Sequence, residues 1–158
     1  MKKLITDFTK QLKDAIEISE KSELTSYSKE IKNIVISGMG GSGIGGNIVS
    51  DAIASELTIP LIVNKDYVLL NYVRENSLVI ISSYSGDTEE TVKAFEDAIS
   101  KNAKIVCICS GGRIKEIAEK ENRDHIIIPK EMPPRAAIAY SIVQLLHILH
   151  FHKIISDS

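Results

Sequence analysis

The segment Asn33-Ile-Val-Ile-Ser-Gly-Met-Gly-Gly-Ser-Gly-Ile-Gly-Gly46 decides the fold. An apolar run over residues 34–36 leads into a glycine-rich stretch, in which six of the nine residues over 38–46 are glycine. Backbone N–H groups in such a stretch can approach a ligand closely, because glycine has no Cβ to block the approach. A helix that follows points its positive end at the same place. The segment therefore predicts a strand, a tight turn and a helix that together bind an anion, with phosphate as the best candidate.

A second loop carries four hydroxyl groups at the end of another predicted strand. The apolar run over residues 77–82 leads into Ser82-Ser-Tyr-Ser-Gly-Asp-Thr88 and then into a helical segment. Hydroxyl groups donate hydrogen bonds to phosphate oxygens, and a threonine before a helix suits the N-cap position. A serine-rich turn with a helix cap is the alternative interpretation. Parallel sheets bind ligands outside the carboxyl ends of their strands, which favours one site shared by both loops.

The chain alternates between predicted strands and predicted helices. Strands are predicted near residues 33–37, 60–64, 78–82, 104–109 and 125–128, and helices near residues 44–56, 88–101, 112–121 and 135–154. An amphipathic helix over residues 2–22 precedes them. Apolar strands separated by amphipathic helices indicate an α/β fold with a parallel sheet covered on both faces. We expect a helix and connection over residues 1–30 and one sheet domain over residues 31–158.

The composition argues against several classes of partner and compartment. The 158 residues carry a net charge of −2 and no tryptophan, so the sequence predicts no nucleic-acid partner. Two cysteines, Cys107 and Cys109, are expected on opposite faces of one strand and unbonded, which suits a reducing cytoplasm. The N-terminus lacks the apolar core of a secretion signal.

One long apolar stretch, over residues 136–155, needs a cover. Five polar residues interrupt it, namely Gln144, His147, His150, His152 and Lys153, so the stretch predicts a buried or interface helix and no membrane span. The helix is apolar nearly all round, and a sheet covers only one side of it. We therefore expect a second domain or a second copy of the chain to cover the rest.

A third segment, Glu131-Met-Pro-Pro-Arg-Ala-Ala137, precedes this helix. Pro134 suits the first turn of a helix, because its fixed φ is already helical. Arg135 then lies near the helix start, where the dipole disfavours a cation. Either an anionic partner compensates for this, or the arginine extends into water.

These three segments, in this order and spacing, resemble the sugar isomerase (SIS) domain. More narrowly, they resemble the first half of the bifunctional phosphoglucose/phosphomannose isomerases. The resemblance implies a three-layer α-β-α sandwich around a five-stranded parallel sheet, a sugar phosphate as ligand, and neither metal nor cofactor. It implies that Gly40 and Gly41 lie against the sugar and that Arg135 steadies negative charge at the reacting end. It also implies a phosphate site made by Ser42, Ser82, Ser83, Ser85 and Thr88.

The sequence departs from that family in one large respect. Members carry two SIS domains in one chain, and the second domain supplies the glutamate that moves the proton and a histidine that helps to open the sugar ring. No residue of this chain matches those two positions, so a phosphosugar-binding module without catalysis is the alternative. Three local carboxylates, Glu89, Glu90 and Glu131, are weaker candidates for the base.

Two further interpretations are weaker. The glycines also fit the dinucleotide fingerprint Gly38-x-Gly40-x-x-Gly43, but the acidic residue expected at the end of the second strand is displaced to Asp66. His147 and His150 lie three residues apart on one predicted helix. Without a companion cysteine or carboxylate cluster, this pair does not predict a metal site.

Overall fold

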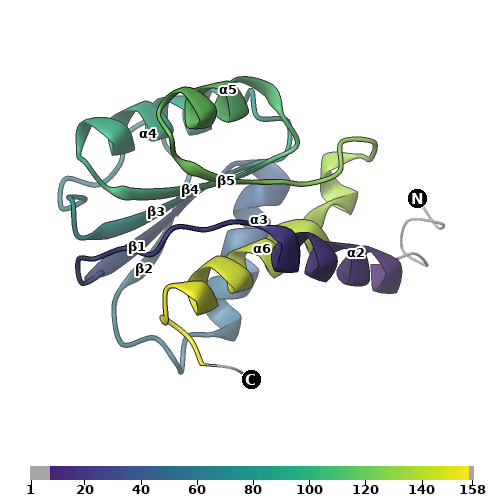
Figure 1. Ribbon diagram of the computed structural model, residues 1–158, viewed down its shortest axis with the longest axis horizontal. Helices are drawn as coiled ribbons and strands as arrows, with labels where there is room; N and C mark the ends of the chain where they lie inside the picture. Colours follow the sequence, from purple (N-terminus) through teal and green to yellow (C-terminus); the bar gives the residue numbers. More distant parts are fainter. Residues whose placement is uncertain (1–7, 157–158) are drawn as a thin grey trace.

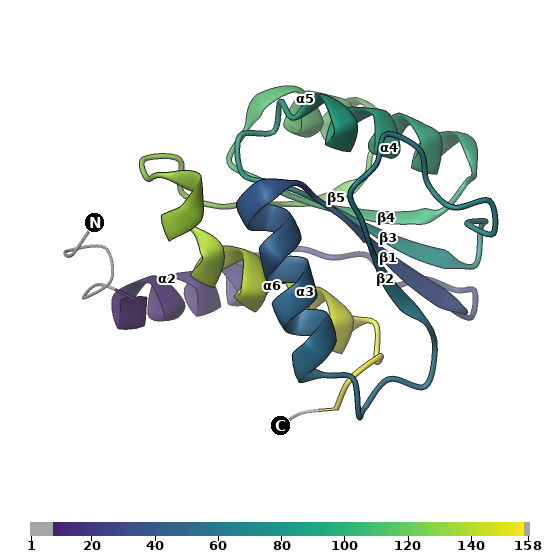
Figure 2. The same cartoon turned by 180° about the vertical axis from the view of Figure 1, so that it is seen from behind.

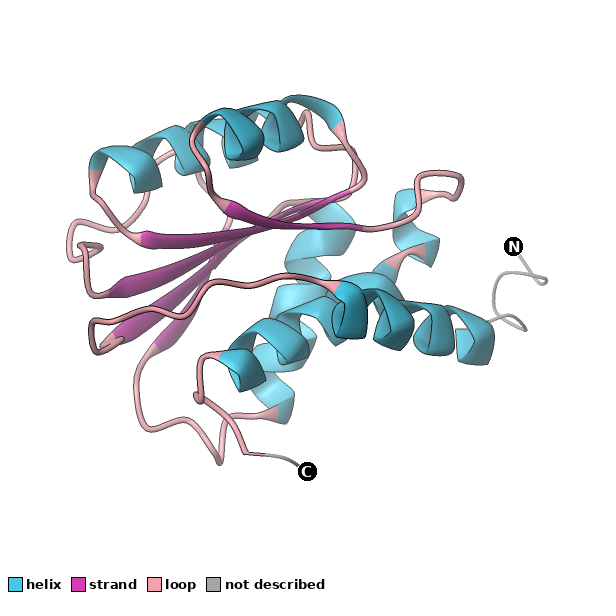
Figure 3. Cartoon of the chain, viewed as in Figure 1, coloured by secondary structure: helices cyan, strands magenta, loops and turns pink. Residues whose placement is uncertain are grey.

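The computed structural model describes residues 8–156, apart from the side chain of Arg135. A five-stranded, all-parallel sheet in the order β2-β1-β3-β4-β5 forms the middle layer (Figures 1 and 3). The strands are β1 (Asn33–Ser37), β2 (Leu61–Asn64), β3 (Ser77–Ser83), β4 (Lys104–Cys109) and β5 (Asp124–Ile127). The helices are α2 (Phe8–Lys21), α3 (Gly40–Ala52), α4 (Glu89–Ser100), α5 (Gly112–Lys120) and α6 (Ile138–Phe151), with a 3-10 turn η1 (Pro134–Ala136) before α6. The predicted α-β-α sandwich is confirmed.

Two apolar cores lie on the two faces of the sheet. Helices α4 and α5 cover one face, and α3 and α6 cover the other (Figures 1 and 2). Successive residues of a strand point to opposite faces, so Ile34 and Ile36 of β1 lie in one core and Val35 between them lies in the other. Cys107 and Cys109 both lie in the core under α4 and α5, as free thiols. The expectation of opposite faces was wrong, because residues two apart in a strand share a face.

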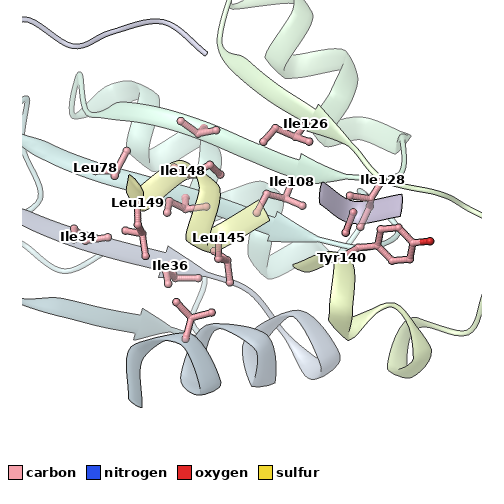
Figure 4. Close-up of a cluster of buried hydrophobic side chains, with 14 of the residues drawn as sticks. Ile34, Ile36, Leu78, Ile108, Ile126, Ile128, Tyr140, Leu145, Ile148 and Leu149 are labelled. Carbon is pink, nitrogen blue, oxygen red and sulfur yellow. The ribbon is translucent and has the colours of Figure 1, made fainter. Parts of the chain in front are cut away.

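Helix α6 is covered by the chain itself. Its residues Tyr140, Leu145, Ile148 and Leu149 pack on strand residues of β1, β3 and β4 (Figure 4). Helices α2 and α3 flank it, and His150 is its one exposed residue. The chain thus supplies much of the cover that the sequence assigned to a partner, and pairing with a second domain or a second copy through this helix stays a prediction. Among residues 8–156, no helix has the length and apolar content needed to cross a membrane.

Helix α2 and its connection are fastened to the sheet domain. Gln144 of α6 donates to the carbonyl of Ala15 at 2.7 Å, and Ala15 is fully buried in the core under α6. Farther along, Lys104 and Asp124 form a buried ion pair at 2.7 Å, and both bond to Thr25. The part of the predicted helix over residues 2–7 lies outside the described residues, and the division of the chain at residue 30 stays a prediction.

Two helix starts differ from the sequence prediction. Helix α3 begins at Gly40 and not near residue 44, because its glycines form the first turns of the helix. Tertiary contacts require them: a Cβ on Gly43 would lie 2.6 Å from the Gly38 carbonyl oxygen, and one on Gly46 would lie 3.1 Å from a methyl group of Ile36. The predicted helix over 135–154 is divided into η1 and α6, with Ala137 between them in a non-helical conformation.

Candidate functional site

The two predicted loops meet at the carboxyl edge of the sheet. Strands β1 and β3 are neighbours, so the loops that follow them lie side by side. The Tyr84 N–H donates to Ser42 Oγ at 3.3 Å, which joins the second loop to the first turn of α3. A Cβ on Gly38 would lie 2.8 Å from the carbonyl oxygen of Ser82. The glycine at this position thus permits the close approach of the loops.

The start of α3 offers backbone N–H groups to an anion. Its N-cap residue, Met39, makes no side-chain cap hydrogen bond, and the first turn contains no acidic residue. Gly40 is exposed and has a φ of +51°, with nothing within 4 Å of the place a Cβ would occupy. Gly41 beside it is half-buried. This end of the helix is therefore open, and its dipole favours a negative charge there.

The hydroxyl groups of the second loop differ in exposure. Ser85 is exposed and Thr88 is half-buried, whereas Ser82 and Ser83 are almost completely buried. Ser83 and Thr88 share a hydrogen bond of 3.0 Å between their hydroxyl oxygens. Thr88 lies at the N-cap position of α4, as predicted, but its hydroxyl bonds to Ser83 and does not cap the helix. Ser82 Oγ has no hydrogen-bond partner among the described residues, so one buried donor beside the glycines is unsatisfied.

The third predicted segment reaches the same edge of the sheet. Turn η1 contains the backbone of Arg135 and packs against α3. The Tyr84 hydroxyl fastens the residues just before it, because it donates to the Lys130 carbonyl at 2.6 Å and accepts from the Met132 N–H at 3.0 Å. The side chain of Arg135 lies outside the described part of the structure, so its direction stays a prediction.

Sequence reasoning missed two residues around the site. Tyr84 contacts three loops, yet nothing in the sequence distinguishes it from a spacer between serines. Lys65 follows β2 directly, and its Cε would lie 3.3 Å from a Cβ on Gly43, so the lysine crosses the first turn of α3. Lys65 comes one residue after a predicted strand, and this position could have identified it as a candidate site residue. Asp66, by contrast, accepts a hydrogen bond from the adjacent Tyr67 N–H at 2.7 Å, so its carboxylate is engaged within its own loop.

The local carboxylates occupy ordinary structural positions. Glu89 and Glu90 lie in the first turn of α4, where carboxylates stabilise the helix dipole. The negative charge of the Glu90 carboxylate also raises the pKa of Tyr67. Glu131 is exposed. None of the three is buried.

The histidines lie away from this site. His147 Nε2 is 3.0 Å from Ser22 Oγ, between α6 and the segment after α2. Burial, with the neighbouring His150, lowers the pKa of His147. Residues 8–156 contain no group of three or more His, Cys, Asp or Glu residues arranged to hold a metal ion.

A cavity of about 610 Å³ lies at the opposite edge of the sheet, near the amino ends of β1 and β2. Residues of the segment before β1, the segment before β2 and the end of α6 line it, including Lys29, Ile31, Ile59 and His152. Burial lowers the pKa of His152 to about 4, so this imidazole is neutral at pH 7. The cavity contains none of the residues predicted to bind a ligand.

Comparison with known proteins agrees with this geometry. The model of the SIS domain family matches residues 28–152. The chain belongs to the SIS domain family. A bifunctional phosphoglucose/phosphomannose isomerase of Caldicellulosiruptor bescii is 46% identical to this SIS domain over 142 residues, which are 90% of this chain and 42% of that protein. The chain thus spans less than half the length of this relative.

Solved structures share the fold of this SIS domain at low sequence identity. The C-terminal domain of glucosamine-fructose-6-phosphate aminotransferase from Francisella tularensis has a TM-score of 0.67 at 17% identity, over 98% of this chain and 49% of that one. The Vibrio vulnificus NanR protein, complexed with ManNAc-6P, has a TM-score of 0.64 at 14% identity, over 96% of this chain and 60% of that one. These similarities establish the fold. The ligand of this chain has to be inferred from its own residues.

Proposed function

We propose that this SIS domain is the phosphosugar-binding half of an isomerase that interconverts glucose 6-phosphate or mannose 6-phosphate with fructose 6-phosphate. The observation that carries the proposal is the contact of Ser42 with the second loop at the open start of α3. This contact gathers hydroxyl and N–H donors at one edge of the sheet. The name of the C. bescii relative supplies the reaction.

In the proposed mechanism, the domain binds the substrate mainly through its phosphate group. It takes hydrogen bonds from the first turn of α3 and from Ser42, Ser85 and Thr88, while Gly40 and Gly41 lie against the sugar. This binding energy holds the sugar chain in place for proton transfer. A base removes the proton from C2 to give a cis-enediolate and returns it to C1, while the proton on O2 passes to O1, so that the aldehyde becomes a hydroxymethyl group and C2 becomes the ketone. Arg135 stabilises the negative charge that develops on the enediolate oxygens.

The proposed base comes from a second SIS half. A general base must lie within hydrogen-bond reach of C1 and C2, and the local carboxylates occupy ordinary structural positions instead. The length of the chain relative to the C. bescii protein supports a two-part enzyme. The same length leaves room for the alternative, in which the domain binds a phosphosugar and does no chemistry.

The chain should bind glucose 6-phosphate about 100-fold or more tightly than glucose, because each charge-assisted hydrogen bond to phosphate contributes about 1.5–3 kcal/mol. Isothermal titration calorimetry with both ligands measures the ratio. Ser42→Ala should weaken binding of glucose 6-phosphate, whereas Ser100→Ala, at the far end of α4, should not. Equal affinities for glucose and glucose 6-phosphate would overturn the proposal.

A coupled isomerase assay separates the enzyme from the binding module. The chain alone should show no turnover, because a positioned base contributes about 10²–10⁴ in rate. Addition of a second SIS half from a relative should restore turnover. If the pair stays inactive while phosphosugar binding is intact, the binding module is favoured. Ordinary turnover by the chain alone would instead make Glu131 the first candidate for the base.

A further inference from the structure

Tyr84 connects the loops around the site through its backbone. Its N–H donates to Ser42 Oγ in the first turn of α3. Its carbonyl accepts two hydrogen bonds from Ser110, from the N–H at 3.0 Å and from the hydroxyl at 2.6 Å, in the loop after β4. The backbone of one residue thus fixes the second loop against both of its neighbours.

The side chain of Tyr84 performs a separate task. Its hydroxyl bridges the Lys130 carbonyl and the Met132 N–H, and its ring packs at the edge of the core under α6. Residues 129–133 form few described hydrogen bonds with other parts of the chain. The partners in these bonds are the Tyr84 hydroxyl and η1. Lys130, Glu131 and Pro133 are exposed, so apart from Met132, which is half-buried at the edge of the core under α6, these residues pack little against the rest of the chain.

The segment held by the hydroxyl leads directly into η1, which contains Arg135. We propose that the Tyr84 hydroxyl is a positioning group. It fixes the position of η1, and with it the backbone of Arg135, relative to the phosphate-binding loops. This inference rests on the proposed function. Loss of the hydroxyl frees the segment before η1 but leaves the backbone contacts of Tyr84 with Ser42 and Ser110 in place. A misplacement of about 1 Å at a reacting group is enough to lower a rate by about 100-fold.

The variant Tyr84→Phe removes the hydroxyl and keeps the ring. Its affinities are measured by calorimetry for two probes: inorganic phosphate, which tests the loops alone, and a five-carbon aldonate 5-phosphate, whose carboxylate resembles the charged end of the enediolate. The wild type should prefer the phosphorylated aldonate. Tyr84→Phe should lose about tenfold of that preference, the equivalent of one hydrogen bond to a charged group, with the phosphate affinity changed less than about twofold.

Tyr27→Phe is the matched control, because the Tyr27 hydroxyl also donates to a backbone carbonyl, that of Glu75, away from the site. It should change neither affinity. Hydrogen exchange followed by mass spectrometry gives a second measurement, in which amides of residues 130–137 should exchange faster in Tyr84→Phe and those of residues 38–46 should not. This readout applies even if the variant is less stable, since the comparison is made between two segments of one protein.

Three results would overturn the inference. An unchanged preference for the aldonate in Tyr84→Phe shows that the hydroxyl does not position η1. Equal losses for phosphate and aldonate show that Tyr84 supports the phosphate loops instead. If the wild-type protein binds neither probe, the proposed function fails and the inference fails with it. This result is distinguished from the first two because it is seen in the wild-type protein, before any variant is measured.

Discussion

Replacement of Gly86 by alanine is expected to lower the free energy of unfolding by about 4 kcal/mol or more, at the upper end of single substitutions. Gly86 has a φ of +77°, and a Cβ there would lie 1.8 Å from the carbonyl oxygen of Gly111 and 2.7 Å from its carbon. Both contacts are with backbone, so no side chain can rotate away. The loops after β3 and β4 would have to separate, at the expense of the hydrogen bond of 2.9 Å from the Ile114 N–H to the Gly86 carbonyl.

Gly40→Ala is the matched control for this experiment. Gly40 also has a positive φ, +51°, but a Cβ there meets nothing within 4 Å. Its cost should be that of the left-handed conformation alone, about 1–2 kcal/mol. Urea denaturation followed by circular dichroism measures both variants. Equal destabilisation would show that the loops after β3 and β4 can separate freely, contrary to the packing described above.

The sequence predicted the sheet well because its strands are local patterns. All residues of β3 and β4 are buried, and a strand buried on both faces appears in the sequence as an uninterrupted apolar run. The start of α3 could not be predicted in this way. Glycine has a low intrinsic helix propensity, so a glycine-rich stretch indicates a loop. In the structure, contacts with Gly38 and Ile36 outweigh that propensity, and such contacts are absent from any local pattern.

The same distinction between local patterns and long-range contacts applies to the residues of the candidate site. Glycines and hydroxyls close together in sequence were recognised because each loop forms its own cluster. Tyr84 was missed because its hydroxyl bonds to backbone groups 46 and 48 residues along the chain, and a backbone group has no residue identity to recognise. The cover that α6 receives from its own chain was missed for a related reason. Apolarity on all sides indicates that a helix is buried, but the sequence pattern does not say that α2 of the same chain buries it.

Arg135→Lys is expected to lower kcat by about 10²–10³ in a protein that joins this chain to a second SIS half, with little change in KM. The arginine fork can hold two oxygens of an enediolate at once, whereas the lysine ammonium is a single point of charge. An interaction made mainly in the transition state appears in kcat. Steady-state kinetics with fructose 6-phosphate measures both constants.

Ser85→Ala should show the opposite division, because Ser85 is proposed to hold the phosphate at every stage of the reaction. Contacts that are equally strong in the ground state and the transition state change KM and leave kcat nearly constant. Ser85 is exposed, and its hydroxyl accepts one hydrogen bond, from the Asp87 N–H at 3.2 Å, so its loss should do little to the fold. The two variants therefore test the two ends of the proposed substrate separately. If Arg135→Lys retains the wild-type kcat while Ser85→Ala raises KM, the phosphate site stands and the catalytic assignment of Arg135 fails.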